Sequence, residues 1–461
     1  MVASKPGIVW VTLDSVRADH TTIHDYGRNT TPELERIADH GQSFTNCFAH
    51  GTGTASSVAS IFTGVWPWEH QVAMNGSVGE IPDQLRTAAE IFRDQGYRTA
   101  CVTTNPRIDL IGGDAGFDEY YDISRSTLLN PKFLPITLRF LKNFWSESVG
   151  LTWKGVHHSF SYIVTEIARR WVESVNGPYF LYVHYNEPHR PYYPPLSYRD
   201  RYTTEVDVPE DRALHTSTEI HERSREYNAG ELEMTRDDWE AVEAIYDAEI
   251  AYTDSYVGSL FDYVESSNPV FVVTADHGEL LGEGSMFGHG QGVVRDELSH
   301  VPLVVSGVSD LAVDEDEIVQ HNDVMRTLLS MAGASDDQFG GFGLRNGQTR
   351  GFAVIQEYLE NFAAFEKHTQ GFNSGSRKLG RIDGLRTDEF KLVVSQDDVV
   401  LYELPDEDTD VSPTRSNVRE RLLEQHEAFN EEHGQPLVDS PTTDDYDERM
   451  KKRLRDLGYI Q

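Results

Sequence analysis

Short, continuous apolar runs alternate with amphipathic segments along most of the chain. Runs without regular polar interruption are typical of strands that are buried on both faces. Apolar residues at helical spacing, with capping signals around them, indicate helices. Because the two kinds of segment alternate, we expect an α/β fold with a mostly parallel sheet sandwiched by helices. The pattern predicts strands at 8–13, 99–104, 179–184, 269–274 and 301–306, and helices at 32–40, 54–64, 86–95 and 237–264.

Three of these predicted strands run directly into polar clusters. Asp14 follows the first strand, the segment 184–189 ends another, and Asp276 and His277 follow a third. Ligand sites of open α/β sheets lie beyond the carboxyl ends of the strands, so parallel strands would bring these clusters together. Carboxylates and imidazoles suit Mn, Mg, Ca or Zn, and we therefore expect a divalent metal site. Taken singly, Asp14 can cap a loop and Asp276 can cap a helix, and that alternative stays open.

The stretch from Phe44 to Gly64 predicts a short strand, a Gly-rich turn and a helix that begins at Thr54. Thr is a favoured N-cap residue, and the first amides of a helix bind anions. A hydroxyl at this place is a candidate nucleophile, since a divalent cation would lower its pKa. An ordinary capped helix explains the same segment when it is taken alone.

The charge of the chain is strongly acidic. Its 461 residues include 76 Asp and Glu against 40 Lys and Arg, a formal charge of -36, and only nine of the basic residues are Lys. Such a surface stays solvated where salt screens charge repulsion, so we expect a salt-adapted, haloarchaeal source. Nucleic acid is not an expected partner, because no basic domain is present to neutralise phosphates.

The cysteines and the hydropathy predict a soluble, cytoplasmic protein. Cys47 and Cys101 provide neither a disulfide framework nor a metal-binding spacing. No apolar run approaches the ~20 residues of a membrane-spanning helix, and the first strand begins already at Ile8, where a signal peptide would lie.

Seven segments, in this order along the chain, resemble the sulfatase family of the alkaline phosphatase superfamily. The resemblance implies the alkaline phosphatase-like fold, with a catalytic domain at 1–340 that carries a cap-like insert near 119–176. It also implies a smaller C-terminal α+β domain at 341–461, with antiparallel strands and charged helices. The segments are VTLDSVR at 11–17, SIFTG at 60–64, HYNEPHRPYYPP at 184–195, YDAEIAYTDSYVGSL at 246–260, TADHGELLG at 274–282, GHGQGVVRDELSHVPLVV at 288–305 and LRTDEFKLVVSQDDVVLYEL at 385–404.

The same resemblance implies roles for particular residues. Thr54 would be the nucleophile, and one divalent metal ion would be held by Asp14, Thr54, Asp276 and His277. Arg17, His184 and His189 would contact the substrate, and His189 or His289 would donate a proton to the leaving oxygen. A second metal ion held by Glu187, His189 and His289 is an alternative with less support from the spacing.

The chain departs from the family at its expected nucleophile. Sulfatases that cleave sulfate esters carry Cys or Ser in C/S-x-P-x-R, which is oxidised to formylglycine, whereas residues 54–58 are TASSV. Thr cannot supply that aldehyde, so no formylglycine is expected. Ser15 replaces the second Asp of the family's usual pair. That replacement argues against a calcium site with four oxygen ligands.

Thr at the nucleophile position resembles the phosphodiesterases and phosphonate hydrolases of the superfamily. We therefore expect hydrolysis or transfer of a phosphoric ester, with a phospho-threonine intermediate. Two alternatives stay open: a sulfuric ester hydrolase that works without formylglycine, and a non-catalytic relative that binds a metal ion or an anion.

The segment 130–158 combines three of the nine lysines with many aromatic residues. Such a patch can face an anionic lipid or a glycan, which makes a glycan-borne or lipid-linked anionic ester a candidate substrate. A helical cap whose aromatic side chains belong to the core is the alternative. The oligomeric state is not indicated by the sequence.

Overall fold

The structure is a computed structural model. It describes residues 5–74, 78–123, 130–143, 148, 160–335, 337–369 and 372–437.

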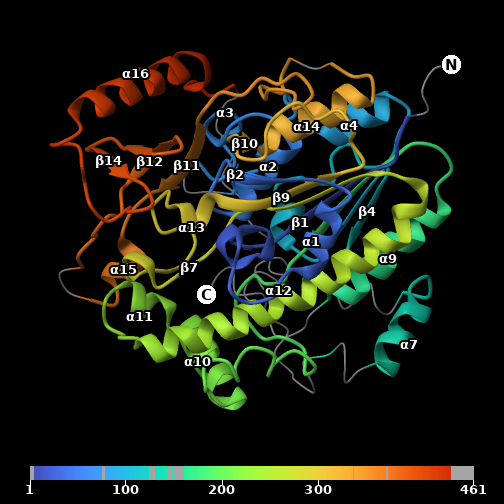
Figure 1. Ribbon diagram of the computed structural model, residues 1–461, viewed down its shortest axis with the longest axis horizontal. Coiled ribbons are helices and arrows are strands. Elements are labelled where there is room, and N and C mark those ends of the chain that lie inside the picture. Colours follow the sequence, from blue (N-terminus) through green and yellow to red (C-terminus); the bar gives the residue numbers. More distant parts are fainter. Residues whose placement is uncertain are drawn as a thin grey trace.

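An eight-stranded sheet forms the centre of the molecule (Figure 1). Its neighbours are parallel except β9, which runs antiparallel to both β2 and β6. The central strands β1, β5 and β6 are buried along their whole length, as their continuous apolar sequences require. The mostly parallel α/β sheet expected from the sequence is thereby confirmed. In sheet order the strands are β10 (Val319–Gln320), β2 (Gly41–Phe48), β9 (His300–Ser306), β6 (Val270–Ala275), β1 (Ile8–Leu13), β5 (Tyr179–Tyr185), β3 (Arg98–Thr103) and β4 (Glu119–Asp122).

Helices cover the sheet on both sides (Figure 1). One layer contains α1 (Pro32–Ala38), α9 (Ser161–Ser174) and the long α12 (Arg236–Val264), and α12 contacts the other two. The second layer contains α2 (Thr54–Thr63), α4 (Ala88–Asp94) and α14 (His321–Met331). No helix in the described part of the chain is long and apolar enough to span a membrane.

A smaller antiparallel sheet follows the main domain, as expected from the sequence. It contains β11 (Ala353–Leu359), β12 (Gly380–Arg386), β13 (Phe390–Val394) and β14 (Val399–Glu403), and α16 (Ser416–His433) lies over it (Figure 1). The predicted charged segment near the C-terminus, 446–457, lies outside the described residues. The remaining elements are α3 (Pro67–His70), α5 (Pro106–Leu110), α7 (Leu134–Lys142), α10 (Glu210–Glu222), α11 (Ser224–Asn228), α13 (Asp296–Ser299), α15 (Ala363–Glu366), β7 (Leu280–Leu281) and β8 (Phe287–Gly288).

The ends of the segment expected to form a cap-like insert, 119–176, belong to the main layers. It begins with β4, which pairs with β3, and ends with α9, which packs against β3 and β5. Between them, residues 124–129, 144–147 and 149–159 lie outside the described residues.

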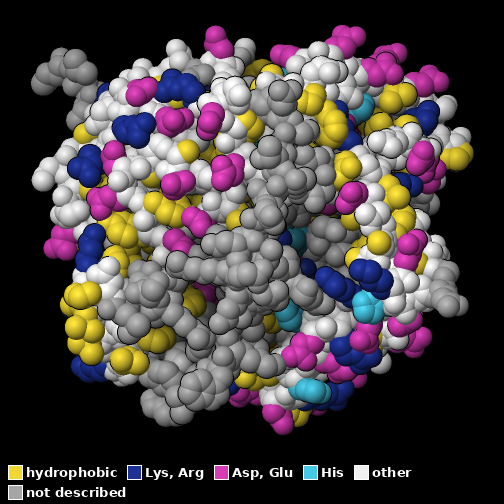
Figure 2. All heavy atoms as spheres, turned by 180° about the vertical axis from the view of Figure 1, so that it is seen from behind, with side chains coloured by type: hydrophobic (Ala, Val, Ile, Leu, Met, Phe, Trp, Pro, Cys, Tyr) yellow, Lys and Arg dark blue, Asp and Glu magenta, His cyan; other side chains and the backbone are white. Residues whose placement is uncertain are grey.

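Helix α7, within that segment, has one buried and one exposed side. Phe133 and Ile136 are buried in the main core, whereas Leu134, Leu138 and Leu141 are 48–57% exposed. Figure 2 shows hydrophobic side chains gathered at the lower left of its face, in the region of this helix. The two described aromatic residues, Phe133 and Phe140, pack against the core as the alternative of a helical cap expects, whereas three leucines of α7 are exposed.

Candidate active site

The register of three central strands brings the predicted polar clusters together. Strand β1 lies between β5 and β6, with Thr12 opposite both His184 and Thr274. Leu13 lies opposite Ala275, so Asp14 and Asp276, the next residue on each strand, leave the sheet side by side. A backbone hydrogen bond from Asp276 N to Leu13 O, 3.3 Å long, continues the pairing to this point.

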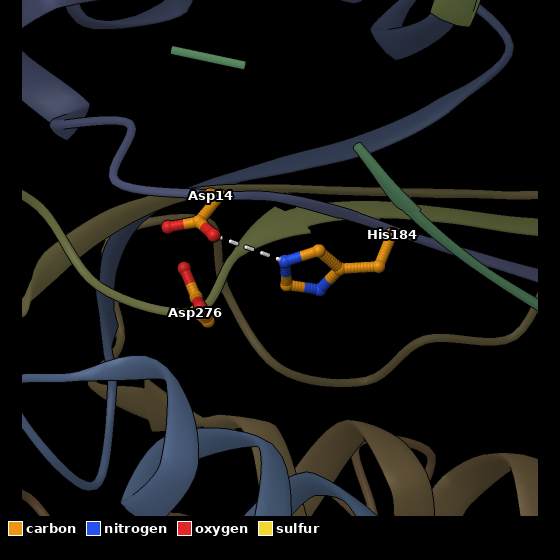
Figure 3. A group of neighbouring side chains, drawn as sticks. All are labelled: Asp14, His184 and Asp276. Atoms are coloured by element: carbon orange, nitrogen blue, oxygen red, sulfur yellow. Dashed lines mark hydrogen bonds and ion pairs between the residues drawn. The ribbon is translucent and has the colours of Figure 1, made fainter. Parts of the chain in front are cut away.

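Asp14, His184 and Asp276 form a compact, fully buried group (Figure 3). Their potential ligand atoms all lie within 4.8 Å of one another, and His184 Nε2 is 3.3 Å from Asp14 Oδ2. Oδ2 of Asp276 is buried and has no hydrogen-bond partner among the described residues. Two buried carboxylates at this distance are costly without a compensating charge. This chemistry fits a divalent cation, and both oxygen and imidazole donors are present.

The group contains two of the four predicted metal ligands, Asp14 and Asp276, and includes neither Thr54 nor His277. His184, expected to contact substrate, lies in the group. Nε2 of His277 lies beside it, 3.7 Å from Asp14 Oδ1 and 3.8 Å from Asp276 Oδ2. Thr54 joins the same neighbourhood through His277, because its Oγ1 lies 3.3 Å from His277 Nε2.

Neighbouring polar groups fix the two carboxylates. Ser15 Oγ donates to Asp14 Oδ1 over 2.9 Å, and Asn105 Nδ2 donates to Asp14 Oδ2 over 2.5 Å. The backbone N–H groups of Ser15 and His277 both donate to Asp276 Oδ1. Ser15 adopts a left-handed conformation with φ 63°, which is uncommon for a side chain other than glycine. Sequence reasoning missed Asn105, although it follows the end of a predicted strand just as Asp14 does.

Burial and charge act differently on the two carboxyl groups. Burial alone would raise the pKa of Asp14, but the nearby His189, His184 and His277 outweigh it and hold that pKa well below its ordinary value. Burial raises the pKa of Asp276, and the adjacent Asp14 adds to the shift although His277 opposes it. The group as a whole therefore favours one negative charge more than two, as expected of carboxylates that share one site.

Thr54 is the first residue of α2 and not its N-cap, which corrects the sequence prediction. The N-cap residue is Gly53, and no side chain caps the helix. The turn before it requires Gly51, since a Cβ there would lie 2.3 Å from Ser56 Oγ. The hydroxyl of Thr54 is consequently directed to His277 and does not bond back to the first turn. The first N–H groups of α2 have no partner within the helix and are available to an anion.

His289 lies beside His277, and His189 lies beside His289. The ring centroid of His289 is 4.5 Å from that of His277 and 5.3 Å from that of His189. His289 Nδ1 lies 2.8 Å from Glu279 Oε1. Burial lowers the pKa of His289 and Glu279 opposes the shift, whereas burial lowers the pKa of His189 to about 3. His289, which has the carboxylate partner, is the better placed of the two to carry a proton.

Two predicted site residues are engaged elsewhere. The guanidinium of Arg17 donates to Asp19, to Glu283 and to the backbone oxygen of Glu279. Glu187 accepts from the backbone N–H of Phe160 and from Ser161 Oγ, both 2.7 Å away, and so fixes the start of α9. Arg17 is thus neutralised by carboxylates, and both carboxylate oxygens of Glu187 are already used.

A cavity of about 210 Å³ opens beside Thr54. The turn before α2, the loop that carries His289 and the strand β11 of the small sheet all contribute to its wall. The residues that line it are Thr52, Gly53, Thr54, Ala55, Ser56, Ala73, Met74, Arg107, His289, Gly290, Gln356, Glu357 and Tyr358.

Comparison with known sequences gives a consistent result. A sequence model described as Sulfatase matches residues 6–334. An arylsulfatase of Clostridium perfringens is 25% identical over 71% of this chain and 75% of its own length. An N-acetylglucosamine-6-O-sulfatase of Bacteroides thetaiotaomicron is 24% identical over 87% of this chain and 80% of its own length.

Among solved structures, the phosphonate monoester hydrolase of Agrobacterium radiobacter superposes with a TM-score of 0.69. The match covers 93% of this chain and 96% of that enzyme, at 21% identity. At this level of identity the likeness shows a shared fold, in both the main domain and the small C-terminal sheet.

Proposed function

Because the chain belongs to the sulfatase family, we propose that it is a metal-dependent hydrolase of a phosphoric ester and that Thr54 is its nucleophile. The observation that carries this proposal is the hydrogen-bond distance of 3.3 Å between Thr54 Oγ1 and His277 Nε2, beside a buried pair of carboxylates. The hydroxyl also lies at the start of α2, where backbone N–H groups can hold the oxygens of an anionic ester.

The residues that would hold the cation are Asp14, His184 and Asp276. A divalent cation bound there would neutralise charge on the ester and lower the pKa of the Thr54 hydroxyl. A ligand role for His277, which the sequence implies, would use the same Nε2 lone pair that accepts the Thr54 hydrogen bond.

The first step forms a bond from Thr54 Oγ to phosphorus and breaks the bond from phosphorus to the leaving oxygen. Nδ1 of His277 lies 2.7 Å from the Gly278 carbonyl and therefore carries the ring hydrogen. Nε2 of His277 is then free to take the Thr54 proton. Protonated His289, stabilised by Glu279 at its other nitrogen, gives its proton to the leaving oxygen.

The second step attacks the phospho-threonine with water, or with an alcohol if the enzyme is a transferase. His289 takes the proton of the attacking oxygen, the bond from phosphorus to Thr54 Oγ breaks, and His277 returns its proton to that oxygen. Both histidines thereby recover their starting states.

A sulfuric ester is the second candidate substrate, since the two sequence relatives are both named as sulfatases. The phosphoric ester is preferred because residues 54, 56 and 58 are Thr, Ser and Val, where formylglycine formation uses Cys or Ser, Pro and Arg. The acidic composition supports a salt-adapted enzyme, and the lysines and aromatic residues of segment 130–158 support an anionic ester of a glycan or lipid.

The proposal is tested in high salt with Mn²⁺ on bis-aryl phosphate, aryl phosphonate and aryl sulfate esters. The Thr54→Ala variant should lose phosphoester turnover by about a thousandfold or more. Thr63→Ala is the matched control, because Thr63 lies at the other end of α2 and its hydroxyl donates to the backbone oxygen of Ala59. Equal turnover by wild type and Thr54→Ala would refute the proposal that Thr54 is the nucleophile. Turnover of the sulfate ester alone would show that the substrate is a sulfuric ester and not a phosphoric ester.

A further inference from the structure

Glu357 is a buried acidic residue in the wall of the cavity beside Thr54, and the chemistry above does not use it. Its side chain is only 7% exposed. No described residue donates a hydrogen bond to its carboxyl group or forms an ion pair with it. Burial is the sole cause of its perturbed protonation and raises its pKa to about 8.

Other buried acids of the small domain are paired. Asp383 accepts from Gln356 and His426 and contacts Arg381, and Glu407 lies 2.9 Å from the ammonium group of Lys391. A buried carboxyl group without a partner costs stability unless a ligand satisfies it. Glu357 is therefore a candidate for contact with a bound molecule.

The fold holds Glu357 at this place firmly. Strand β11 lies beside the turn that precedes α2, where Gln356 N donates to His50 O over 2.8 Å and pairs with Gly51. The Gln356 side chain also accepts from Trp68 N, at 2.8 Å. The small C-terminal sheet thus supplies Glu357 to a cavity whose opposite wall contains the candidate nucleophile.

The charges in the cavity divide it into two chemical environments. The start of α2, with Arg107 and His289 also in the wall, suits the oxygens of an anionic ester. A carboxyl group suits an O–H or N–H donor instead. The volume is below the roughly 300–1,000 Å³ of sites for drug-sized ligands, so the space suits a small polar ligand.

We propose that Glu357 forms a subsite for a hydroxyl or ammonium group on the alcohol part of the ester. The substrate is then the ester of a sugar or amino sugar and not of a plain alkyl or aryl alcohol. This inference rests on the proposed function for the position of the ester, while the subsite itself requires only that the alcohol part binds.

The test compares phenyl phosphate with glucose 6-phosphate and glucosamine 6-phosphate, and each with its sulfate counterpart. For Glu357→Ala, kcat/KM for a sugar ester should fall about tenfold more than kcat/KM for the phenyl ester, mainly through KM. Glu360→Gln, at an exposed acid on the segment after β11, should change neither value. Equal losses on sugar and phenyl esters would overturn the proposal, since Glu357 would then serve the ester group or the fold.

Glu357→Gln distinguishes the two donor groups. An amide still pairs with a hydroxyl, so a sugar hydroxyl predicts a loss smaller than that of Glu357→Ala. An ammonium group requires the negative charge, and predicts a loss as large as that of Glu357→Ala on the glucosamine ester. Melting temperatures of both variants identify a loss that comes only from unfolding.

Titration calorimetry with free glucose or glucosamine, which have no ester group, tests the subsite independently of the reaction. If no ester is turned over but the free sugar binds and Glu357→Ala abolishes binding, the subsite stands and the proposed function fails. If Thr54-dependent turnover occurs but Glu357→Ala shows no preference between sugar and phenyl esters, the proposed function stands and the subsite fails.

Discussion

The hydroxyl of Thr54 lies 3.3 Å from Nε2 of His277, although 223 positions separate the two residues in the chain. Thr54 begins α2 and His277 follows the carboxyl end of β6, so the contact depends on how this helix packs against the sheet. Because Nδ1 of His277 faces the Gly278 carbonyl, only Nε2 can accept from the hydroxyl.

This contact predicts different effects for the two buried histidines. His184→Ala should weaken Mn²⁺ binding by about tenfold to a hundredfold, since it removes a donor of the compact group. His277→Ala should retain most Mn²⁺ affinity and lose turnover. Titration calorimetry with Mn²⁺, combined with initial rates, measures both. If instead His277→Ala weakened Mn²⁺ binding and His184→Ala did not, His277 would be a metal ligand, as the sequence implies.

A second prediction concerns Asp276 and the cation. Excess Mn²⁺ should raise the melting temperature of the wild type, because ligand binding to the folded state adds stability in proportion to the logarithm of ligand concentration. Asp276→Asn should abolish this increase. In EDTA the same variant should melt no lower than the wild type, since it removes one of two buried, mutually repelling carboxyl groups.

Asp316→Asn, an exposed acid near the end of the main sheet, is the control and should keep the Mn²⁺ effect. If Asp276→Asn also kept it, the buried group would not be the cation site.

The sequence predicted most of the main fold because buried strands leave a clear pattern. The predicted bounds of the 8–13 strand are those observed. The strands at 179–184 and 301–306 differ by one residue at one end, and those at 99–104 and 269–274 are shifted by one residue. The antiparallel direction of β9 could not be predicted, because a continuous apolar run such as VPLVVS is compatible with either direction.

The candidate site was only partly predictable. Asp14 and Asp276 follow strands and could be found from that position alone. The contacts of Asn105 with Asp14 and of Glu279 with His289 depend on the order of strands and the course of loops. Glu357 gave a weak signal, as a lone acid in the apolar strand AVIQEYL, but its place in the cavity depends on the docking of the small sheet.

A third prediction concerns the contact between the small sheet and the main domain. Lys391 on β13 is fully buried and pairs with Glu407 at 2.9 Å and with Asp296 of α13. Lys391→Met should lower the free energy of unfolding by about 3–5 kcal/mol, because Glu407 is left buried without its cation and the partly buried Asp296 keeps only Arg386 among its described partners. Urea unfolding measures the change.

Lys378→Met is the matched control. Lys378 also pairs with an acid, Asp398, at 2.8 Å, but half of the Asp398 side chain is exposed. Its removal should cost less than about 1 kcal/mol. Similar losses for both variants would mean that burial of the Lys391 pair does not determine its contribution.

The last prediction follows from the protonation of Glu357. Burial raises its pKa in the folded state to about 8, whereas the unfolded chain has the ordinary value of 4.5. Between these two values the unfolded state has lost the proton that the folded state keeps. The contribution of Glu357 to stability is thus fully present below pH 4.5 and is lost as the pH rises toward 8, by at most roughly 1.4 kcal/mol per pH unit.

Glu357→Gln has no such proton, so its melting temperature relative to the wild type should increase steadily from pH 5 to pH 8. A constant difference over that range would show that the Glu357 carboxyl group is already ionised in the folded protein.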